Sequence, residues 1–347
     1  MTILFWNVRR LDRAQKRNIV RNTVKQSKCW IACLQETKLQ NVDKKLVTSS
    51  CGSSFLEWHC KEAWGSAGGL LTCWDPNQIS GVAIHFGEYS ITTQFSMQGD
   101  YFLWHLTNVY GPHHRHTRSI LMGELHHIKS AHPGPWVIVA DFNVTRFSSE
   151  RTGAASSRAA SKEFNICINQ LGLIEINAPS KKFIWTNFRE EPSLVKLDRC
   201  SISLEWHNRC PLTSLSSLVR TTSDHTPLLL TFNSSCRQNA NRFKPFRFEN
   251  AWYLHQDLES LINQWWVSAP SSPEAISNLV LKLHFLQSKL KDLGAKKMLE
   301  IYSNKKREAE ARIESIDILE EERNLSEEEI NERTKLKSQL DVLIQQE

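Results

Sequence analysis

Short apolar runs separated by polar turns extend from the start of the chain to about Phe232. Many of these runs are rich in β-branched or aromatic residues, which is typical of strands. Helical stretches, with apolar residues three and four positions apart, lie between them at 13–27, 118–130 and 161–171. This alternation predicts stacked sheets covered by helices. The predicted strands are Ile3–Trp6, Trp30–Leu34, Gly69–Trp74, Val82–Phe86, Tyr101–Val109, Trp136–Ala140, Lys182–Trp185 and Pro227–Phe232.

The pattern changes after Asn233, where a polar, turn-rich segment precedes the aromatic cluster FKPFRFENAW. Five leucines from Leu279 to Leu293 then step by 4, 3, 4 and 3, the spacing of an apolar seam on a packed helix. Ser326 and Glu329 form an S-x-x-E capping box that opens a last helix. We expect a main domain at 1–235, a connector at 236–275 and a helical, coiled-coil-like tail at 276–347.

The tail pattern favours packing within the chain, and self-association is the alternative. Its last helix continues to Glu347, as it would in a chain cut from a longer protein.

No apolar run in the chain reaches the roughly 18 residues of a spanning helix, and the apolar run at the start is too short for a signal peptide. We therefore expect no membrane association and an intracellular protein.

The amino-acid composition excludes only a few classes of protein. The 347 residues are 40% hydrophobic and 23% charged, which is ordinary for a globular protein. Nine cysteines without a C-x-x-C pair indicate neither a disulfide framework nor a ribbon-type zinc site. Residues 1–290 hold 32 Lys and Arg against 22 Asp and Glu, whereas residues 291–347 hold 11 against 15. The basic excess suggests a polyanionic partner such as nucleic acid, although many proteins that bind none are also basic.

Polar residues come directly at the ends of five predicted strands, which is a common way to build a site on a rigid sheet. Glu36, Asp224 and the amide oxygens of Asn7 or Asn143 could hold one hard cation, and Mg²⁺ fits such oxygen ligands best. Asp198 could orient His225 through a ring N–H. Metal, carboxylate and histidine together suit phosphoryl chemistry. The five clusters are Asn7, Gln35-Glu36, Tyr110-Gly111-Pro112, Asp141-Phe142-Asn143 and Ser223-Asp224-His225.

Each of these residues also has an ordinary explanation when it is taken singly. Glu36 could be a solvated strand end, Tyr110 could cap a core, and Asp198 could form a surface ion pair with Arg199. The histidines at 113–116 and 126–127 lack carboxylate or cysteine partners at zinc-site spacing, so an exposed loop is the simpler interpretation for the first group.

Eight short motifs, in order over residues 1–232, resemble the endonuclease/exonuclease/phosphatase superfamily, and more narrowly the endonuclease domain of plant LINE-type (non-LTR) retrotransposon proteins. The resemblance implies a four-layered α/β sandwich, with two mostly antiparallel sheets flanked by helices, followed by an α-helical tail. It also suggests that the chain is truncated before a reverse transcriptase. The motifs are NVRRL, LQETKL, GGLLTCW, NVYGP, ADFN, WTN, KLDR and SDHTPL.

The same resemblance implies a role for each candidate site residue. Glu36, Asn7 and Asp224 would hold the metal, and Tyr110 would contact the phosphate. Asp141, with Asn143 beside it, would activate water, while Asp198 would orient His225 toward the phosphoryl oxygens. Whether Asp141 or His225 acts as the base stays open. Thr186 and Ser223 would support the scissile phosphate.

The implied function is Mg²⁺-dependent DNA nicking that leaves a 3′-hydroxyl, with Mn²⁺ as an alternative metal, DNA as the partner and the nucleus as the location. Other phosphoesterases of the superfamily, such as an abasic-site endonuclease or a phosphatase, remain alternatives, as does a decayed nucleic-acid-binding protein. Two residues depart from the family pattern, because Arg10 and Ala140 stand where glycine is usual. If either position needs a positive φ, the change would strain the turn by roughly 1 kcal/mol or more.

Overall fold

The computed structural model describes residues 1–65, 67–97, 102–153, 157–178, 181–232, 257–269 and 299–345, with single positions between 279 and 290. The chain forms two compact units. One contains Met1–Arg237 and Glu314–Asn331, and the other contains Gln238–Ile313 and Glu332–Glu347. The expected domain limits at 235 and 275 lie outside the described residues and stay a prediction. Within the described ranges, no helix combines the length and apolar character that crossing a membrane requires.

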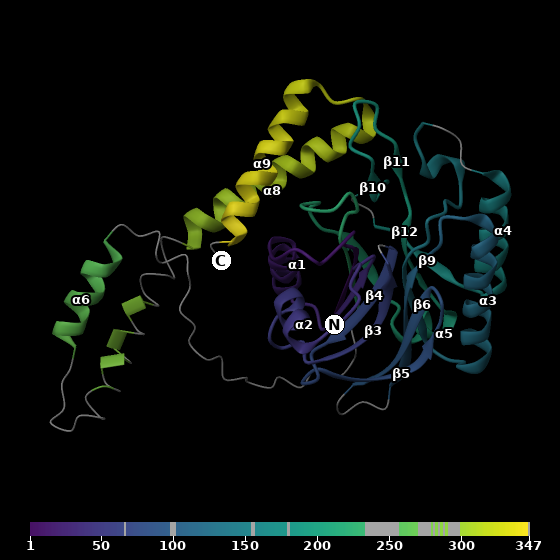
Figure 1. Ribbon diagram of the computed structural model, residues 1–347, viewed down its shortest axis with the longest axis horizontal. Helices are drawn as coiled ribbons and strands as arrows, with labels where there is room; N and C mark the ends of the chain where they lie inside the picture. Colours follow the sequence, from purple (N-terminus) through teal and green to yellow (C-terminus); the bar gives the residue numbers. More distant parts are fainter. Residues whose placement is uncertain are drawn as a thin grey trace. The chain divides into compact units, whose positions relative to one another are not determined.

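The first of two six-stranded sheets has the order β13-β14-β1-β2-β4-β3, and Figure 1 labels its strands β3 and β4. β1 and β2 run parallel, and the other neighbours are antiparallel. β1 reads as an unbroken apolar run because both of its faces are buried. The strands are β1 (Thr2–Asn7), β2 (Ile31–Gln35), β3 (Glu57–Trp64), β4 (Ala67–Trp74), β13 (Ser214–Ser217) and β14 (Leu228–Thr231).

The second sheet has the order β5-β6-β7-β8-β12-β9, and β7 and β8 are its parallel pair. A separate two-stranded sheet joins β10 (Trp185–Thr186) to β11 (Leu194–Val195). The expected strand at Lys182–Trp185 is therefore wrong in its bounds, since only its last residue lies in β10. The strands of the second sheet are β5 (Ile79–Phe86), β6 (Ser90–Met97), β7 (Leu103–Tyr110), β8 (Trp136–Asp141), β9 (Ile174–Ile176) and β12 (Asp198–Ile202).

Helices cover the outer faces of both sheets. Apolar residues of α1 and α2 pack with Leu4 and Trp6 of β1, and those of α3 and α4 pack with Ile138 and Ala140 of β8. The four-layered α/β sandwich with two mostly antiparallel sheets is thus confirmed, since each sheet contains a single parallel pair. The helices of this part are α1 (Ala14–Ser27), α2 (Lys44–Cys51), α3 (Arg115–Ala131), α4 (Arg158–Gln170), α5 (Leu204–Arg209) and the 3-10 turn Ser148–Glu150.

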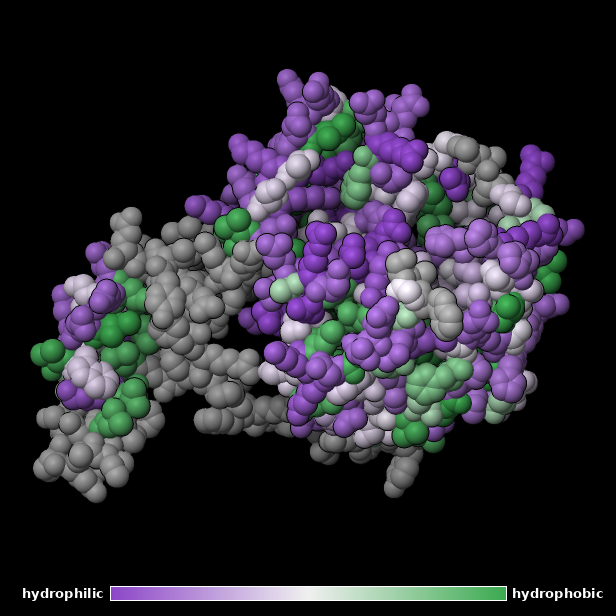
Figure 2. Space-filling model, viewed as in Figure 1, coloured by the Kyte–Doolittle hydropathy of each residue, from purple (hydrophilic) through white to green (hydrophobic). Residues whose placement is uncertain are grey.

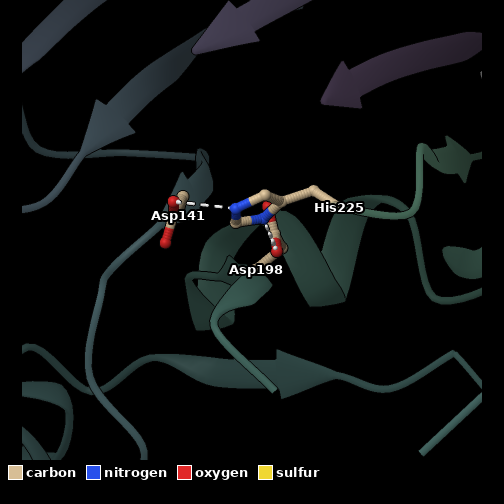
Figure 3. Close-up of side chains that lie close together, drawn as sticks. All are labelled: Asp141, Asp198 and His225. Carbon is tan, nitrogen blue, oxygen red and sulfur yellow. Dashed lines mark hydrogen bonds and ion pairs between the residues drawn. The ribbon is translucent and has the colours of Figure 1, made fainter. Parts of the chain in front are cut away.

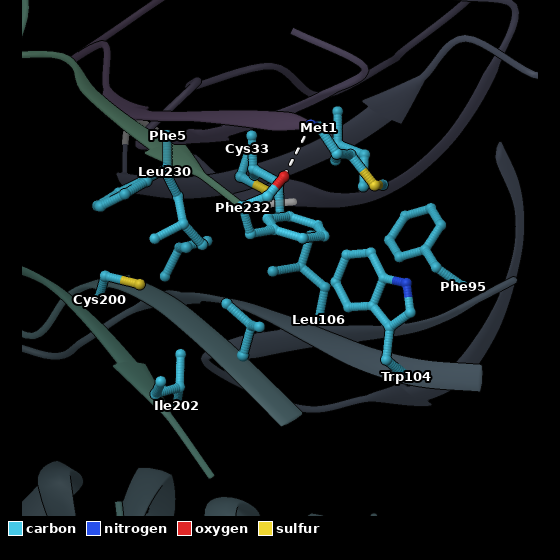
Figure 4. Packing of buried hydrophobic residues seen from close by; sticks show 14 of the residues in the cluster. Met1, Phe5, Cys33, Phe95, Trp104, Leu106, Cys200, Ile202, Leu230 and Phe232 are labelled. Carbon is cyan, nitrogen blue, oxygen red and sulfur yellow. Dashed lines mark hydrogen bonds between the residues drawn. The ribbon is translucent and has the colours of Figure 1, made fainter. Parts of the chain in front are cut away.

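The largest core cluster lies between the two sheets (Figure 4). Trp104 is fully buried, and the ring of Trp206 lies 5.0 Å from it and 4.6 Å from the ring of Phe232. Burying one large apolar side chain contributes roughly 2–3 kcal/mol, so this cluster is a main source of stability. The N-terminal ammonium of Met1 donates to the carbonyl of Phe232 at 2.8 Å, which ties the start of β1 to the segment after β14.

The C-terminal part is helical, as expected, with α6 (Leu258–Ser268), α8 (Leu299–Glu322) and α9 (Glu327–Gln345). The capping box is confirmed, because the Ser326 amide donates to the Glu329 carboxylate at 2.8 Å and the Glu329 amide donates to the Ser326 hydroxyl at 3.3 Å. From the leucine seam, Leu286 and Leu290 pack near Leu258 of α6. Leu293 lies outside the described residues, and a coiled coil stays a prediction.

Candidate active site

Two parallel strand pairs bring the predicted polar residues to one end of the sheets. Asn7 pairs with Gln35 across β1 and β2, and Tyr110 pairs with Asp141 across β7 and β8. Parallel strands end at the same sheet edge, so the residues that follow each apolar run meet there. Gly111 allows the close approach of the loop after β7, because a Cβ there would lie 2.5 Å from the carbonyl oxygen of Phe142.

Two antiparallel connections add the late residues to this end. β12 runs antiparallel to β8 with Asp198 opposite Asp141, and β14 runs antiparallel to β1. His225 lies shortly before β14, and the Trp6 indole N–H donates to the His225 carbonyl at 2.9 Å. Residues separated by more than two hundred positions therefore gather in one place.

Asp198, His225 and Asp141 form a buried line at the centre of the site (Figure 3). The His225 Nδ1 lies 2.7 Å from an Asp198 oxygen, and the Nε2 lies 3.8 Å from Asp141 Oδ2 and 4.0 Å from Asp224 Oδ1. Asp198 thus fixes the ring, while the second nitrogen faces the other carboxylates. Among the described residues, this is the one trio of His, Cys, Asp or Glu close enough to share a metal ion.

The pKa values of His225 and Asp141 are both raised in this buried line. Burial alone would lower the pKa of His225, but the carboxylates of Asp198 and Asp141 outweigh it and raise this pKa to about 9. Burial raises the pKa of Asp141 to about 6, although the charge of His225 opposes the change. At neutral pH the pair is therefore an imidazolium beside a carboxylate, which can donate and accept protons.

Two asparagines hold Asp141 in place from opposite sides. The Asn7 amide nitrogen donates to Asp141 Oδ2 at 2.8 Å, and the Asn143 backbone N–H donates to Oδ1 at 3.0 Å. The Asn143 side chain donates to the Gly111 carbonyl at 2.7 Å. Asn7 also donates to Glu36 at 3.2 Å, and its oxygen accepts the Arg9 backbone N–H. In this arrangement Asn7 supports the carboxylates through its nitrogen, so a role as metal ligand stays a prediction.

Glu36 and Asp224 lie on either side of one guanidinium. Arg9 is 3.4 Å from Glu36 Oε2 and 2.9 Å from Asp224 Oδ2, and the ammonium of Lys38 is 3.2 Å from the other oxygen of Glu36. The space between the two carboxylates therefore accommodates a cation. Their hard oxygen donors fit Mg²⁺ or Mn²⁺, with no thiolate or imidazole required.

Tyr110 and Lys16 complete the inner surface. Burial and the nearby carboxylates of Glu36 and Asp141 raise the pKa of Tyr110, so its hydroxyl is neutral and can donate. Burial lowers the pKa of Lys16, on α1, to about 8, although the carboxylates of Asp224 and Glu36 oppose the change. Both groups can offer hydrogen bonds to a phosphate.

Thr186 and Ser223 belong to the hydrogen-bond network behind the site. The Ser223 hydroxyl donates to the Asn7 carbonyl at 2.8 Å, and the Thr186 hydroxyl accepts the Phe188 N–H at 3.3 Å. The Thr186 backbone N–H donates to the Asp224 carbonyl at 3.1 Å. These contacts hold the loop that carries Asp224 and His225, and the predicted contact of both hydroxyls with a phosphate stays a prediction.

Backbone strain is concentrated at the site, but not at the two positions expected from the sequence. Arg10 and Ala140 are absent from the described non-glycine residues with positive φ, so the condition for strain is met at neither position. The positive value falls instead on Arg9, at 64°, and similar values occur at Glu36, Lys38 and Asn143. Such conformations are costly and persist where surrounding structure fixes them, commonly at functional sites.

Arg10 and Arg199 have partners that the sequence did not indicate. Arg10 is exposed and pairs with Asp12 at 2.8 Å, so it does not block the site. Arg199 is buried and pairs with Glu150 and Glu175, which removes the alternative of a surface ion pair with Asp198.

Three groups that touch or face the predicted site residues were not among the residues predicted from the sequence. The Trp185 indole N–H donates to Asp224 Oδ2 at 2.9 Å, although only Thr186 of the WTN motif was assigned a role. Arg9 and Lys16 were likewise passed over. A signal was present for the two cations, because residues 9–28 contain eight Lys or Arg and a single acidic residue.

Solved structures of other proteins share the fold. The endonuclease domain of TRAS1, a telomere-specific non-LTR retrotransposon, has a TM-score of 0.51 at 12% identity, covering 68% of this chain and 99% of that domain. AP endonuclease LMAP from Leishmania major has a TM-score of 0.53 at 16% identity, covering 66% and 86%. At these identities the likeness concerns the fold alone.

The sequence assigns the chain to a family. The profile of the Endonuclease/Exonuclease/phosphatase family matches residues 4–225, well over half of the chain, so the chain belongs to that family. No curated protein matches the sequence.

Proposed function

We propose that this chain is a metal-dependent endonuclease that nicks one strand of DNA and leaves a 3′-hydroxyl, as expected of a LINE-type retrotransposon protein of plant origin. The observation that carries the proposal is the buried line of Asp198, His225 and Asp141 beside the carboxylate pair of Glu36 and Asp224. Family membership and the fold shared with the TRAS1 endonuclease domain support it. Access to chromosomal DNA would require a nuclear location.

In this proposal the protein residues divide the proton work. Asp198 orients His225 and keeps it protonated at neutral pH, so that the Nε2–H can bind or protonate the phosphoryl oxygens. Asp141, held by Asn7 and Asn143, orients the attacking water and is one of the two candidates to accept its proton. Because His225 and Asp141 interact strongly, their titration belongs to the pair, and the general base is assigned to the pair and not to one residue.

Glu36 and Asp224 would hold the metal, Mg²⁺ or alternatively Mn²⁺, with Asn7 as the third predicted ligand. When bound, the ion would polarise the phosphoester and stabilise the leaving oxygen. Arg9, whose side chain is 44% exposed, would then turn its guanidinium toward a phosphate of the substrate.

DNA is the proposed partner because Arg9, Lys16 and Tyr110, which surround the predicted metal site, can all donate hydrogen bonds to phosphates. Tyr110 would contact the scissile phosphate, with Thr186 and Ser223 supporting its position. The cations of residues 9–28 begin at the site and continue along α1, so flanking phosphates would bind there. Binding should therefore weaken steeply with salt.

Nicking of supercoiled plasmid tests this function directly. The full chain should convert supercoiled to open-circular DNA with Mg²⁺, and Glu36→Ala or a chelator should abolish conversion. Equal conversion by Glu36→Ala, or without divalent metal, would refute the mechanism.

A comparison of substrates separates the proposal from its rivals. Preference for an abasic duplex would favour an abasic-site endonuclease, and preference for small phosphoesters would favour a phosphatase. DNA binding without metal-dependent turnover would favour a non-catalytic binding protein.

A further inference from the structure

Residues 184–186, which lead into and form β10, are hydrogen-bonded to the catalytic loop. The Thr226 N–H donates to the Ile184 carbonyl at 2.8 Å, and the Thr186 N–H donates to the Asp224 carbonyl at 3.1 Å. Between them, Trp185 forms a β-bridge with His225 and donates its indole N–H to Asp224. The position of residues 184–186 therefore affects the position of Asp224 and His225.

The chain just before these residues is held by a buried ion pair with α8. The ammonium of Lys181 lies 2.9 Å from Glu314 Oε2 and 3.2 Å from Asp317 Oδ2. The side chains of Lys181 and Asp317 are each only 1% exposed. A charge at such a depth requires its partner, so this contact fixes the register of the two segments.

A third carboxylate of α8, that of Glu321, takes the place of a neighbouring strand. Glu321 accepts the backbone N–H groups of Lys182 and Phe183 at 3.4 and 3.3 Å. These are the donors that an adjacent strand would otherwise satisfy. Residues 314–331 belong to the same compact unit as the sandwich, and Figure 1 shows the end of α8 beside β10 and β11.

An exposed ion pair on the same two helices provides a comparison. Figure 2 shows mostly hydrophilic residues over α8 and α9 on the face in view. The ion pair between Arg312 and Glu332, at 2.8 Å, has side chains that are 48% and 40% exposed. Surface pairs of this kind contribute little, which makes it a suitable control.

We propose that residues 314–331 are a working part of the nuclease, and that Lys181 with Asp317 is a positioning contact that acts through Trp185 on Asp224. The inference rests on the proposed function. It assigns to the helical tail a role in the reaction that neither the family match nor the sequence motifs give it. Lys181 does not touch the reacting groups, and its effect is on their placement.

The test compares Lys181→Met and the milder Glu321→Gln with the control Arg312→Met, each in the full chain. Steady-state nicking should show kcat lowered at least about tenfold in Lys181→Met, with KM changed by no more than about twofold. Glu321→Gln should show a smaller loss in the same direction, and Arg312→Met should match the wild type. Unchanged kcat in folded Lys181→Met and Glu321→Gln would overturn the proposal.

A double-mutant cycle distinguishes positioning from general destabilisation. Trp185→Phe removes the N–H that Asp224 accepts, so Lys181→Met should add little further loss in that background. If kcat of the double variant falls by the product of the two separate reductions, Lys181 does not act through Trp185.

Hydrogen exchange gives a readout that does not depend on turnover. The amides of residues 181–186 should exchange faster in Lys181→Met and at the wild-type rate in Arg312→Met. If the wild type nicks no DNA, the proposed function fails and the inference is decided by this exchange. Unchanged protection in Lys181→Met would overturn it.

Discussion

Replacing Asp198 by asparagine removes the charge that holds the ring of His225 while keeping the size of the side chain. The Asp198 oxygen lies 2.7 Å from Nδ1, and both side chains are buried. The difference between the pKa of about 9 and the ordinary 6.5 corresponds to a preference of ~3 kcal/mol for the protonated ring. An opposite charge at this distance accounts for a change of about 1 to 3 in a pKa, so Asp198→Asn should lower the value to about 8 or less.

The sign of the stability effect follows from this raised pKa. The pKa of His225 is about 9 in the folded state and 6.5 in the unfolded state. The protonated ring therefore contributes its full stabilisation of the fold below pH 6.5. That contribution is lost as the pH rises through about 9. Asp198→Asn should therefore destabilise the protein most near and below neutral pH, and less in alkali.

Two measurements check the prediction. NMR titration of ¹³C-labelled histidine without divalent metal, with His225→Gln to assign the signal, gives the pKa directly. In nicking, the alkaline limb of the pH profile should move to lower pH, and the rate at neutral pH should fall by about 10²- to 10⁴-fold. Asp12→Asn, at an exposed ion pair, is the matched control. A signal that still titrates near pH 9 in Asp198→Asn would refute the reasoning.

Three further predictions follow from other parts of the structure. The nicking rate should fall as the pH drops through about 6, because Asp141 becomes protonated, and a flat profile between about pH 5 and 7 would contradict its role. Arg9→Ala should tighten Mn²⁺ binding measured by calorimetry without DNA, since it removes the cation that competes for Glu36; weaker binding would show that Arg9 helps to build the site. Trp104→Ala should lower the free energy of unfolding by ~3–5 kcal/mol in denaturant titration. Trp104→Phe should cost much less, because the indole N–H has no hydrogen-bond partner among the described residues, and equal losses would contradict this.

The sheets and the centre of the site could be predicted because local signals and topology agree. Asn7, Glu36, Tyr110 and Asp141 each follow an apolar run, and parallel pairing brings such strand ends together. β12 gave no such signal because the sequence DRCSI contains Arg199, a charge that becomes acceptable in the core only through its carboxylate partners.

The parts that were missed depend on contacts that no local pattern encodes. Arg9 reaches the carboxylates from a backbone with φ of 64°, and the family pattern had pointed to the next residue instead. The pairing of Lys181 with Asp317 joins positions 136 apart, from segments with different periodicity. Charged helices usually present such residues to solvent, so the sequence pointed to the apolar seam as the packing surface of the tail and gave no sign of Asp317.

The position of the bound metal is the most direct test of the account. In crystals of the full chain soaked with Mn²⁺, the anomalous scattering should show one ion between Glu36 and Asp224, with the ring of His225 still paired to Asp198. An ion bound instead by Asp141, Asp198 and His225 would contradict the division between metal ligands and proton-handling groups, and the mechanism built on it.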